Sequence, residues 1–261
     1  MNKEYLETAI LAAQQGGRIL RDYFDKVHDA RQKNENARDI VTEVDILAEK
    51  TICETIAAAF PDHEIIGEEM QSSPQENRNR WFIDPIDGTV NYSQGIGICV
   101  VSVAFEQDGE LIAGVMFNPF TEELFYATRG GGAFLNGREI NVSTKTAVHD
   151  ALLVAAFSSA RGDKKKKEYE LFGKLNDSSR GVLRLGSAAL ALAYLACGRV
   201  DGVWAIDLFP WDLAAGLLLV REAGGSVVNP AGEPYRFGDS YCIATNRGIE
   251  APLVKVIREY V

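Results

Sequence analysis

The chain has 261 residues, of which 46% are hydrophobic and 25% charged, a composition typical of a soluble globular protein. It is long enough for one large domain or two closely packed halves. The net charge of −10 argues against non-specific binding to nucleic acid or anionic lipid. No apolar run is long enough to span a membrane and the first residues lack the pattern of a signal peptide, so we expect a cytoplasmic protein without a membrane partner.

Apolar spacing predicts two helices at the start of the chain. Apolar residues recur at spacings of three and four over residues 6–24 and again over residues 41–60, where Pro61 ends the second helix. The polar stretch between them, residues 28–38, is expected to be an exposed loop. Short β-rich runs follow at residues 64–66, 81–83, 98–105, 112–117 and 123–127. Turn residues separate these runs, which favours antiparallel hairpins or a meander.

After about residue 146 the pattern alternates between strands and helices. Strands are predicted at residues 151–155, 182–184, 202–206, 226–228 and 242–244. Helices are predicted at residues 164–175, 187–197 and 212–223, with one more at the end of the chain. This order favours layers of helices and sheets around a shared core. We therefore predict an α+β half over residues 1–145 and an α/β half over residues 146–261, packed as one unit, with the break near residues 143–150.

The most informative motif is Asp-Pro-Ile-Asp-Gly-Thr at residues 84–89, directly after an apolar run. Proline cannot donate to a strand ladder, so Pro85 is expected to end the strand. Asp84 and Asp87 can then face one point from either side of a tight turn, with the Ile86 carbonyl turned inward. Two carboxylates and a carbonyl are hard oxygen donors, which suit Mg²⁺ better than zinc.

The end of the same motif is suited to a phosphate group. Gly88 and Thr89 would present backbone N–H groups at the start of a turn or helix, where phosphate commonly binds. The alternative interpretation is an ordinary turn, because Asp-Gly is common in turns and Asp87 could hydrogen-bond its own backbone. Two aspartates around a proline, followed by Gly-Thr, favour the functional interpretation.

Three further acidic groups stand at the ends of predicted elements, where side chains can converge on a cleft. Glu68 follows an apolar strand within Gly-Glu-Glu, a pattern that alone is more often a solvated pair. Asp45 lies near a helix start, where Thr42 could be the N-cap and the helix dipole favours an acid at the third position. Asp212 follows Pro-Trp and opens a helix of small residues, so it could itself be an N-cap.

Taken together, these four stretches resemble the inositol monophosphatase family, within the lithium-sensitive, Mg²⁺-dependent sugar phosphatases. The likeness covers nearly the whole chain, and its most specific parts are residues 84–89 and 211–216. The matching stretches of lower specificity are residues 41–45, 67–69 and 133–137. Agreement at five stretches in the right order favours membership of the family over chance.

The resemblance implies a five-layered α-β-α-β-α sandwich, usually a homodimer, with two or three Mg²⁺ ions per site. It implies two sets of metal ligands: Glu68, Asp84 and the Ile86 carbonyl for one ion, and Asp84, Asp87 and Asp212 for a second. Glu68 would also hold a weaker third ion and so take part in catalysis, while Asp45 and Thr89 would orient the attacking water. The implied substrate contacts are Asp87, Gly88, Thr89, Gly186, Ser187, Ala188 and Asp212.

The expected reaction is hydrolysis of a small phosphate monoester, inositol monophosphate or a related sugar phosphate, by a metal-activated water. A metal can lower the pKa of bound water from about 16 toward about 7, so no protein nucleophile is needed. Fructose 1,6-bisphosphate, histidinol phosphate and 3′-phosphoadenosine 5′-phosphate stay open as alternative substrates. A regulatory binding protein of transcription complexes is the alternative from another class; the intact acidic set and the net charge argue against it.

Two departures from the family pattern concern the substrate and not the metal ligands. Members that act on inositol usually carry a glutamate seven residues before the last aspartate, and here that position is Ala205. Asp207 could replace it only if no bulge interrupts the strand. The loop over residues 91–97 also lacks a basic residue, and the expected early lysine, Lys33, is one residue further from Asp45 than usual.

Overall fold

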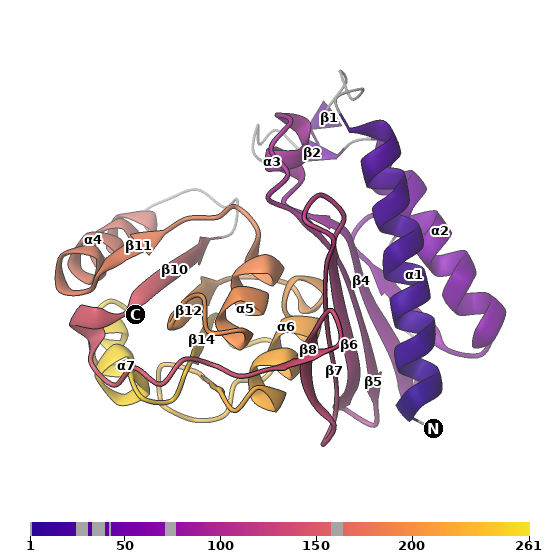
Figure 1. The fold of residues 1–261 in the computed structure, drawn as a ribbon. Helices are drawn as coiled ribbons and strands as arrows, with labels where there is room; N and C mark the ends of the chain where they lie inside the picture. The colour runs from indigo at the N-terminus through magenta and orange to yellow at the C-terminus, as the bar shows by residue number, and fades with distance from the viewer. Residues whose placement is uncertain (1, 25–30, 33–39, 42, 71–76, 158–163) are drawn as a thin grey trace.

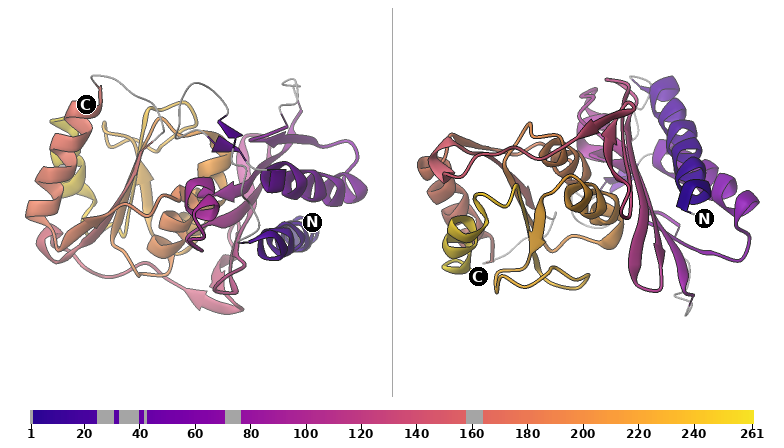
Figure 2. Two further views of the ribbon diagram at one scale, coloured as in Figure 1. Left: turned by 90° about the horizontal axis from the view of Figure 1, so that it is seen from above. Right: turned by 60° about the horizontal axis from the view of Figure 1, so that its bottom comes forward.

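The fold is a sandwich of five layers in the order α-β-α-β-α, which confirms the predicted fold class. The computed structural model describes residues 2–24, 31–32, 40–41, 43–70, 77–157 and 164–261. Helices α1 and α2 form one outer layer and α4 and α7 the other, while α5 and α6 lie between two sheets (Figure 1). Two further directions show the same separation of the sheets by the central helices (Figure 2).

The first half contains the longer sheet and its covering helices. Its elements are α1 (Asn2–Tyr23), β1 (Arg31–Gln32), β2 (Ile40–Val41), α2 (Glu43–Ala59), β3 (Glu64–Gly67), β4 (Asn79–Asp87), α3 (Thr89–Ser93), β5 (Val100–Gln107), β6 (Glu110–Asn118), β7 (Glu123–Thr128), β8 (Gly132–Leu135) and β9 (Arg138–Ile140). The seven strands β3 to β9 follow one another in space as they do in sequence. Only β3 and β4 are parallel, so the predicted antiparallel meander is confirmed for β4 to β9.

Both faces of this sheet are covered, which explains why its central strands are apolar throughout. Residues of α1 and α2 pack on one face with Trp81, Ile83 and Val103. On the other face Phe82 and Ala104 pack with residues of α5 and α6. A strand buried on both faces reads as a continuous apolar run instead of an alternating one.

The second half is built from strand–helix units, as predicted. Its elements are the 3₁₀ turn η1 (Val148–Asp150), β10 (Leu152–Phe157), α4 (Lys164–Ser178), β11 (Gly181–Leu183), α5 (Ala188–Ala196), β12 (Gly202–Ile206), α6 (Pro210–Glu222), β13 (Ser226–Val228), β14 (Tyr241–Thr245) and α7 (Glu250–Arg258). The sheet order is β11-β10-β12-β14-β13, and β10 is parallel to both of its neighbours. The carboxyl ends of β11, β10 and β12 therefore meet at one edge, where α/β sheets usually bind ligands. The boundary near residues 143–150 stays a prediction.

The central helices approach the first sheet through small residues. A Cβ at Gly114 in β6 would lie 3.0 Å from the Cα and carbonyl oxygen of Ala215 in α6. A Cβ at Gly216 would crowd Leu192 of α5 and Met116 of β6. Every residue of α6 from Leu213 to Val220 is buried, since each face of this helix has a neighbour. Glycine at these contacts lets the backbones come close enough to exclude solvent.

Several local predictions were wrong. Pro85 does not end β4, because the strand continues to Asp87 through an irregularity in its pairing with β5. Part of the predicted loop over residues 28–38 is a strand, since β1 pairs antiparallel with β2. The hairpin of β8 and β9 was not predicted. His63, which looks isolated in the sequence, stacks on Phe60 and Phe105 and accepts a hydrogen bond from the Trp81 indole.

The four cysteines are free thiols: Cys53, Cys99, Cys197 and Cys242. Within the described ranges, no helix combines the length and the apolar character that crossing a bilayer requires.

Gly114→Ala tests the close contact between β6 and α6. The added methyl group has to displace backbone atoms of Ala215, so the free energy of unfolding should fall by about 1–3 kcal/mol. Urea denaturation measures the change. Gly173→Ala in α4 is the matched control: apart from its chain neighbours and its own helix backbone, no atom of the described residues lies within 4 Å of its Cβ position, so stability should rise by about 0.4–1 kcal/mol. If both substitutions changed the free energy of unfolding equally, the close contact between Gly114 and Ala215 would be contradicted.

Candidate metal centre and adjoining pocket

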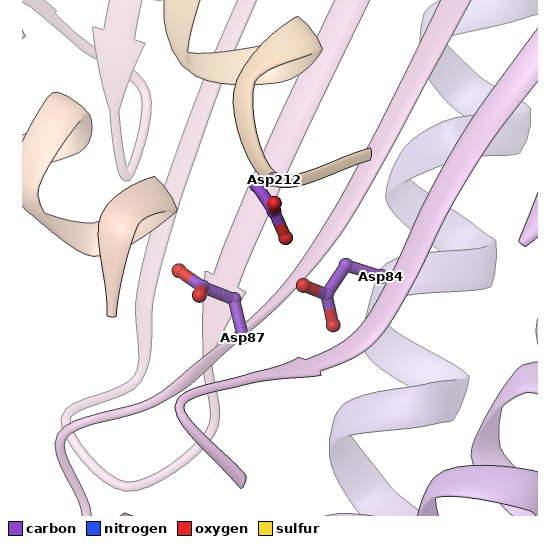
Figure 3. A group of neighbouring side chains, drawn as sticks. All are labelled: Asp84, Asp87 and Asp212. Atoms are coloured by element: carbon purple, nitrogen blue, oxygen red, sulfur yellow. The ribbon is translucent and has the colours of Figure 1, made fainter. Parts of the chain in front are cut away.

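Three aspartates from the two halves converge on one point. Asp84 and Asp87 come from the end of β4, and Asp212 comes from the first turn of α6. One carboxylate oxygen of each lies within 4.8 Å of those of the other two. Their side chains face a common space (Figure 3). Three hard oxygen donors at this spacing fit a divalent cation of the Mg²⁺ or Ca²⁺ type.

A bulge in β4 places the first two carboxylates on the same side. Asp84 pairs with Ser102 and Asp87 with Val100, so three steps along β4 match two along β5. The extra residue takes Pro85 out of the ladder, which is where a strand tolerates proline. Asp84 Oδ1 accepts a hydrogen bond of 2.9 Å from the Ile86 backbone N–H, which holds the turn closed.

Asp87 is anchored to the second half of the chain. Its Oδ2 accepts hydrogen bonds from the Ser187 hydroxyl at 2.6 Å and from the Ala189 backbone N–H at 2.5 Å. Ser187 is also the N-cap of α5, because its hydroxyl oxygen accepts a bond from the Leu190 N–H at 3.2 Å. The first turn of α5 therefore fixes the orientation of this carboxylate.

Asp212 occupies the third position of α6 and not its N-cap. Its Oδ2 accepts a hydrogen bond of 2.8 Å from the backbone N–H of Phe209, the residue before the helix. The simple N-cap interpretation of the sequence is therefore wrong. The Ser102 hydroxyl of β5 donates to the Trp211 carbonyl at 3.3 Å, which ties the start of the helix to the first sheet.

Asp45 and Thr89 lie together beside the cluster. Asp45, in the first turn of α2, is completely buried. The Thr89 hydroxyl lies 3.2 Å from Asp45 Oδ1 and 2.9 Å from the Ile86 carbonyl oxygen. One hydroxyl proton can serve only one of these acceptors at a time. Thr42, predicted as the N-cap, is outside the described residues.

Glu68 follows β3 and is not one of the three carboxylates within 4.8 Å of one another. Its backbone N–H donates to the Ile83 carbonyl at 3.2 Å, which sets the loop beside β4. Its charge is nonetheless close enough to raise the pKa of Asp84 and, to a smaller extent, that of Asp87. Glu68 therefore borders the cluster from the first half.

Burial and mutual repulsion disfavour the charged forms of these carboxylates. Burial raises the pKa of Asp84 well above its usual range, and the neighbouring charges of Glu68, Asp87 and Asp212 raise it further. Burial also raises the pKa of Asp87, to about 6, although hydrogen bonds from Ser187 and Ala189 oppose the shift. A bound cation would reverse this field, because its positive charge favours the ionised carboxylates.

A pocket of about 420 Å³ opens from the cluster toward the second sheet. Its lining residues are Asp87, Val90, Asn91, Ala155, Ala156, Phe157, Arg184, Leu185, Gly186, Ser187, Ala188, Leu208 and Asp212. The predicted contacts Gly186, Ser187 and Ala188 are therefore in the pocket wall. Phe157, Arg184 and Leu208 were not predicted from the sequence. Of these three, only Arg184 could have been suspected, because it lies two residues before Gly186-Ser187-Ala188.

Neither Ala205 nor Asp207 lines this pocket. Ala205 is buried in the central hydrophobic core. Asp207 is exposed and has a positive φ of 51°, so it does not continue the alternation of β12. The condition set for Asp207 to replace the missing glutamate is therefore not met. Lys33 lies outside the described residues.

The chain was compared with known families, sequences and structures. The inositol monophosphatase family matches residues 1–261. A protein of Aquifex aeolicus named fructose-1,6-bisphosphatase/inositol-1-monophosphatase is 36% identical over 258 residues, covering 99% of this chain and 97% of its own length. An inositol-1-monophosphatase of Rhizobium meliloti is 38% identical, covering 97% and 96%. The Nus factor SuhB of Escherichia coli K12 is 37% identical, covering 92% and 89%.

Solved structures give the same fold. The extragenic suppressor protein suhB of Bartonella henselae has a TM-score of 0.92 and 33% identity, covering 98% of this chain and 99% of its own. An IMPase of Thermotoga maritima has a TM-score of 0.90 and 33% identity, covering 98% and 97%.

The layered fold and its cluster of carboxylates are those of a phosphoric monoester hydrolase that depends on metal ions. The chain belongs to the inositol monophosphatase family, as its motifs predicted. Enzymes of this family act on small phosphorylated substrates, so the cluster and the adjoining pocket are the candidate active site.

Asp84→Asn tests whether the buried charges destabilise the metal-free protein. A carboxyl whose pKa rises on folding stabilises the fold below its unfolded pKa, and this contribution is lost as the pH rises through the folded pKa. Because the pKa values of Asp84 and Asp87 are both raised, the metal-free wild type should lose stability above about pH 4, with Asp87 titrating at about 6. Asp84→Asn should be more stable than the wild type at about pH 8, by roughly 1–3 kcal/mol.

Urea unfolding in EDTA at about pH 4 and about pH 8 measures this difference. Asp177→Asn, on an exposed position of α4, is the control and should leave the pH dependence unchanged. If the wild type is as stable as Asp84→Asn at the higher pH, the buried charges do not destabilise the metal-free protein.

Proposed function

We propose that the protein hydrolyses the phosphate monoester of inositol or of a related sugar, in a reaction that requires Mg²⁺. The observation that carries the proposal is the convergence of Asp84, Asp87 and Asp212 within 4.8 Å beside a pocket of about 420 Å³, which Asp87 and Asp212 line. The size of the pocket suits a small metabolite. Relatives named inositol-1-monophosphatase and fructose-1,6-bisphosphatase/inositol-1-monophosphatase support the same class of substrate.

Two or three Mg²⁺ ions are proposed to bind at the cluster. Glu68, Asp84 and the Ile86 carbonyl would hold one ion, Asp84, Asp87 and Asp212 a second, and Glu68 a weaker third. Carboxylate and carbonyl oxygens are the donors that Mg²⁺ prefers. When bound, the ions supply Lewis acidity: they neutralise charge on the phosphate and make water a better nucleophile.

The chain's own groups would orient the reactants. The Thr89 hydroxyl lies between Asp45 and the Ile86 carbonyl. It would orient the attacking water, accept a proton from it and donate its own proton to Asp45. The backbone N–H groups of Gly88 and Thr89 would hold the phosphate. The water oxygen forms a bond to phosphorus as the ester oxygen leaves with the electron pair of the broken bond, and the alcohol then takes up a proton.

The second half would bind the alcohol part of the substrate. Gly186, Ser187 and Ala188 line the pocket on that side, together with Asp87 and Asp212. Ser187 would act mainly through Asp87, because its hydroxyl proton is already donated to that carboxylate. Ala205 gives no hydrogen bond to a substrate hydroxyl, so a sugar phosphate other than inositol phosphate is a full candidate.

Three further predictions made from the sequence belong to the same proposal. The protein would work in the cytoplasm as a homodimer, and each chain would consist of the halves 1–145 and 146–261. Direct binding to nucleic acid is not expected at a net charge of −10.

A regulatory role in transcription is the second candidate function, because some relatives are named Nus factors. The cluster of three carboxylates, with Asp84 buried, favours the enzyme, because like charges at this spacing are costly unless a cation neutralises them. A role in transcription would then be carried by another surface of the same fold.

Asp212→Asn should abolish turnover, because it removes one of three charges that would hold the metal while keeping the hydrogen bond to the Phe209 N–H. A loss of at least about 10²-fold in kcat is expected. Phosphate release from inositol 1-phosphate and from the alternative esters, with Mg²⁺ in excess, is the measurement. Glu54→Gln, on an exposed position of α2, is the control and should keep full activity. Substantial activity in the Asp212 variant would remove the basis of the proposed function.

A further inference from the structure

The pocket contains a cation that the proposed reaction does not use. Arg184 lines the pocket together with Asp87 and Asp212, which are its other charged lining residues. Arg184 is exposed to solvent. Among the residues that the structure describes, no carboxylate forms an ion pair with it. Its charge is therefore available to a ligand in the pocket.

The fold holds Arg184 in place from two sides. Strand β11 ends at Leu183, directly before Arg184, and the neighbouring parallel strand β10 ends at Phe157. Arg184 and Phe157 therefore stand at the edge of the sheet where the carboxyl ends of these strands meet. The Arg184 guanidinium lies over the Phe157 ring, 5.8 Å from its centre. Stacking on an aromatic ring uses the face of the guanidinium and leaves the N–H groups at its edge free to donate.

We propose that Arg184 forms an anion subsite for a second acidic group of the substrate, a phosphate or a carboxylate. This rests on the proposed function, which places the scissile phosphate at the carboxylate cluster. The pocket then presents both acidic residues for metal ions and a guanidinium, which complements a molecule with two anionic groups. The preferred substrates would be phosphate esters of sugars that carry a second phosphate or carboxylate.

Fructose 1,6-bisphosphate and fructose 1-phosphate are the matched pair that tests the subsite, since they differ only in the second phosphate. The wild type should hydrolyse the bisphosphate with a kcat/KM about 10- to 100-fold higher, the range expected for one charge-assisted bidentate contact. Arg184→Gln should reduce this preference to about 2-fold or less through KM, with fructose 1-phosphate unaffected. Arg180→Gln, an exposed arginine that pairs with Asp150, is the control and should keep the preference.

The outcomes separate the two proposals. An equal loss on both esters, or no preference in the wild type, would overturn the subsite while the proposed hydrolysis stands. If neither ester is hydrolysed and inositol 1-phosphate is not hydrolysed either, the proposed function fails instead. Titration calorimetry of fructose 1,6-bisphosphate in Mg²⁺ buffer then tests the subsite without turnover: equal affinity of wild type and Arg184→Gln would overturn it, and about 10-fold weaker binding by the variant would support it.

A separate observation concerns the loop that carries Glu68. Glu49, a completely buried residue of α2, accepts hydrogen bonds from the backbone N–H groups of Glu69 at 2.9 Å and of Met70 at 2.6 Å. A Cβ at Gly67 would overlap the Glu49 carboxylate, so only glycine leaves room for it. One buried carboxylate thus holds the two residues that follow Glu68 and packs against the residue before it.

We infer that Glu49 is a positioning residue for Glu68, and that Gly67 is required because of it. This inference also rests on the proposed function, which gives Glu68 a role in metal binding. An ionised carboxylate offers two acceptor oxygens to the two N–H groups, whereas an amide offers one oxygen and turns an NH₂ group toward the second donor. Loss of one contact should let the loop move and weaken the metal site without removing a ligand.

Titration calorimetry with Mg²⁺ on the folded protein tests this role without relying on activity. Glu49→Gln should weaken metal binding by about 10-fold, while kcat at saturating Mg²⁺ stays within about 3-fold of the wild type. Gly67→Ala should weaken binding in the same way, and the exposed Glu54→Gln should not change it. Far-UV circular dichroism shows that each variant is folded. Unchanged metal affinity in both folded variants would overturn the inference.

Discussion

The site depends on how closely helix α6 approaches the first sheet. Asp212 belongs to the second half, whereas Asp84 and Asp87 belong to β4, so their meeting requires α6 to lie almost directly on the strands. Gly114 permits this, because a side chain there would collide with the backbone of Ala215, one turn along the helix from Asp212. The same layer of small and apolar residues joins the two halves into one core. Packing at residues that bind no metal therefore sets the distances among the carboxylates.

That packing has an electrostatic cost, because it buries charges of the same sign. The pKa of Asp84 is raised well above its usual range, first by burial and then by its acidic neighbours. Asp87 is partly compensated by donors from the first turn of α5, yet its pKa is still raised to about 6. A fold selected for stability alone would not retain such a cluster. Its retention is understandable when a divalent cation completes the site and favours the ionised forms.

The sequence predicts the layers of the fold well because each layer has its own periodicity. The spacing of three and four in α1 and the apolar runs of β4 and β5 identify the elements before any contact is known. The course of β4 past Pro85 could not be predicted in the same way. A proline signals the end of a strand locally, and only the pairing of Asp84 with Ser102 and of Asp87 with Val100 shows that it lies in a bulge.

The same contrast applies to the site. Asp84, Asp87 and Asp212 stand in motifs short enough to be recognised from the sequence. Arg184 and Glu49 gain their meaning from partners far along the chain, the Phe157 ring in one case and Gly67 with the following loop in the other. No local pattern encodes such contacts, because they arise only when β10 meets β11 and when α2 packs against β4.

The structure also indicates which positions can change the substrate without harming the reaction. The loop before α5 lines the pocket and at the same time donates two hydrogen bonds to Asp87, so a substitution at Ser187 alters recognition and the metal centre together. Arg184 stacks on Phe157 and contacts none of the three aspartates through a hydrogen bond or ion pair. Evolution toward a new sugar phosphate is therefore expected to change positions such as Arg184, which line the pocket without contacting the aspartates. Residues 84–89 and the loop that holds Asp87 are expected to stay unchanged, because the reaction itself depends on them.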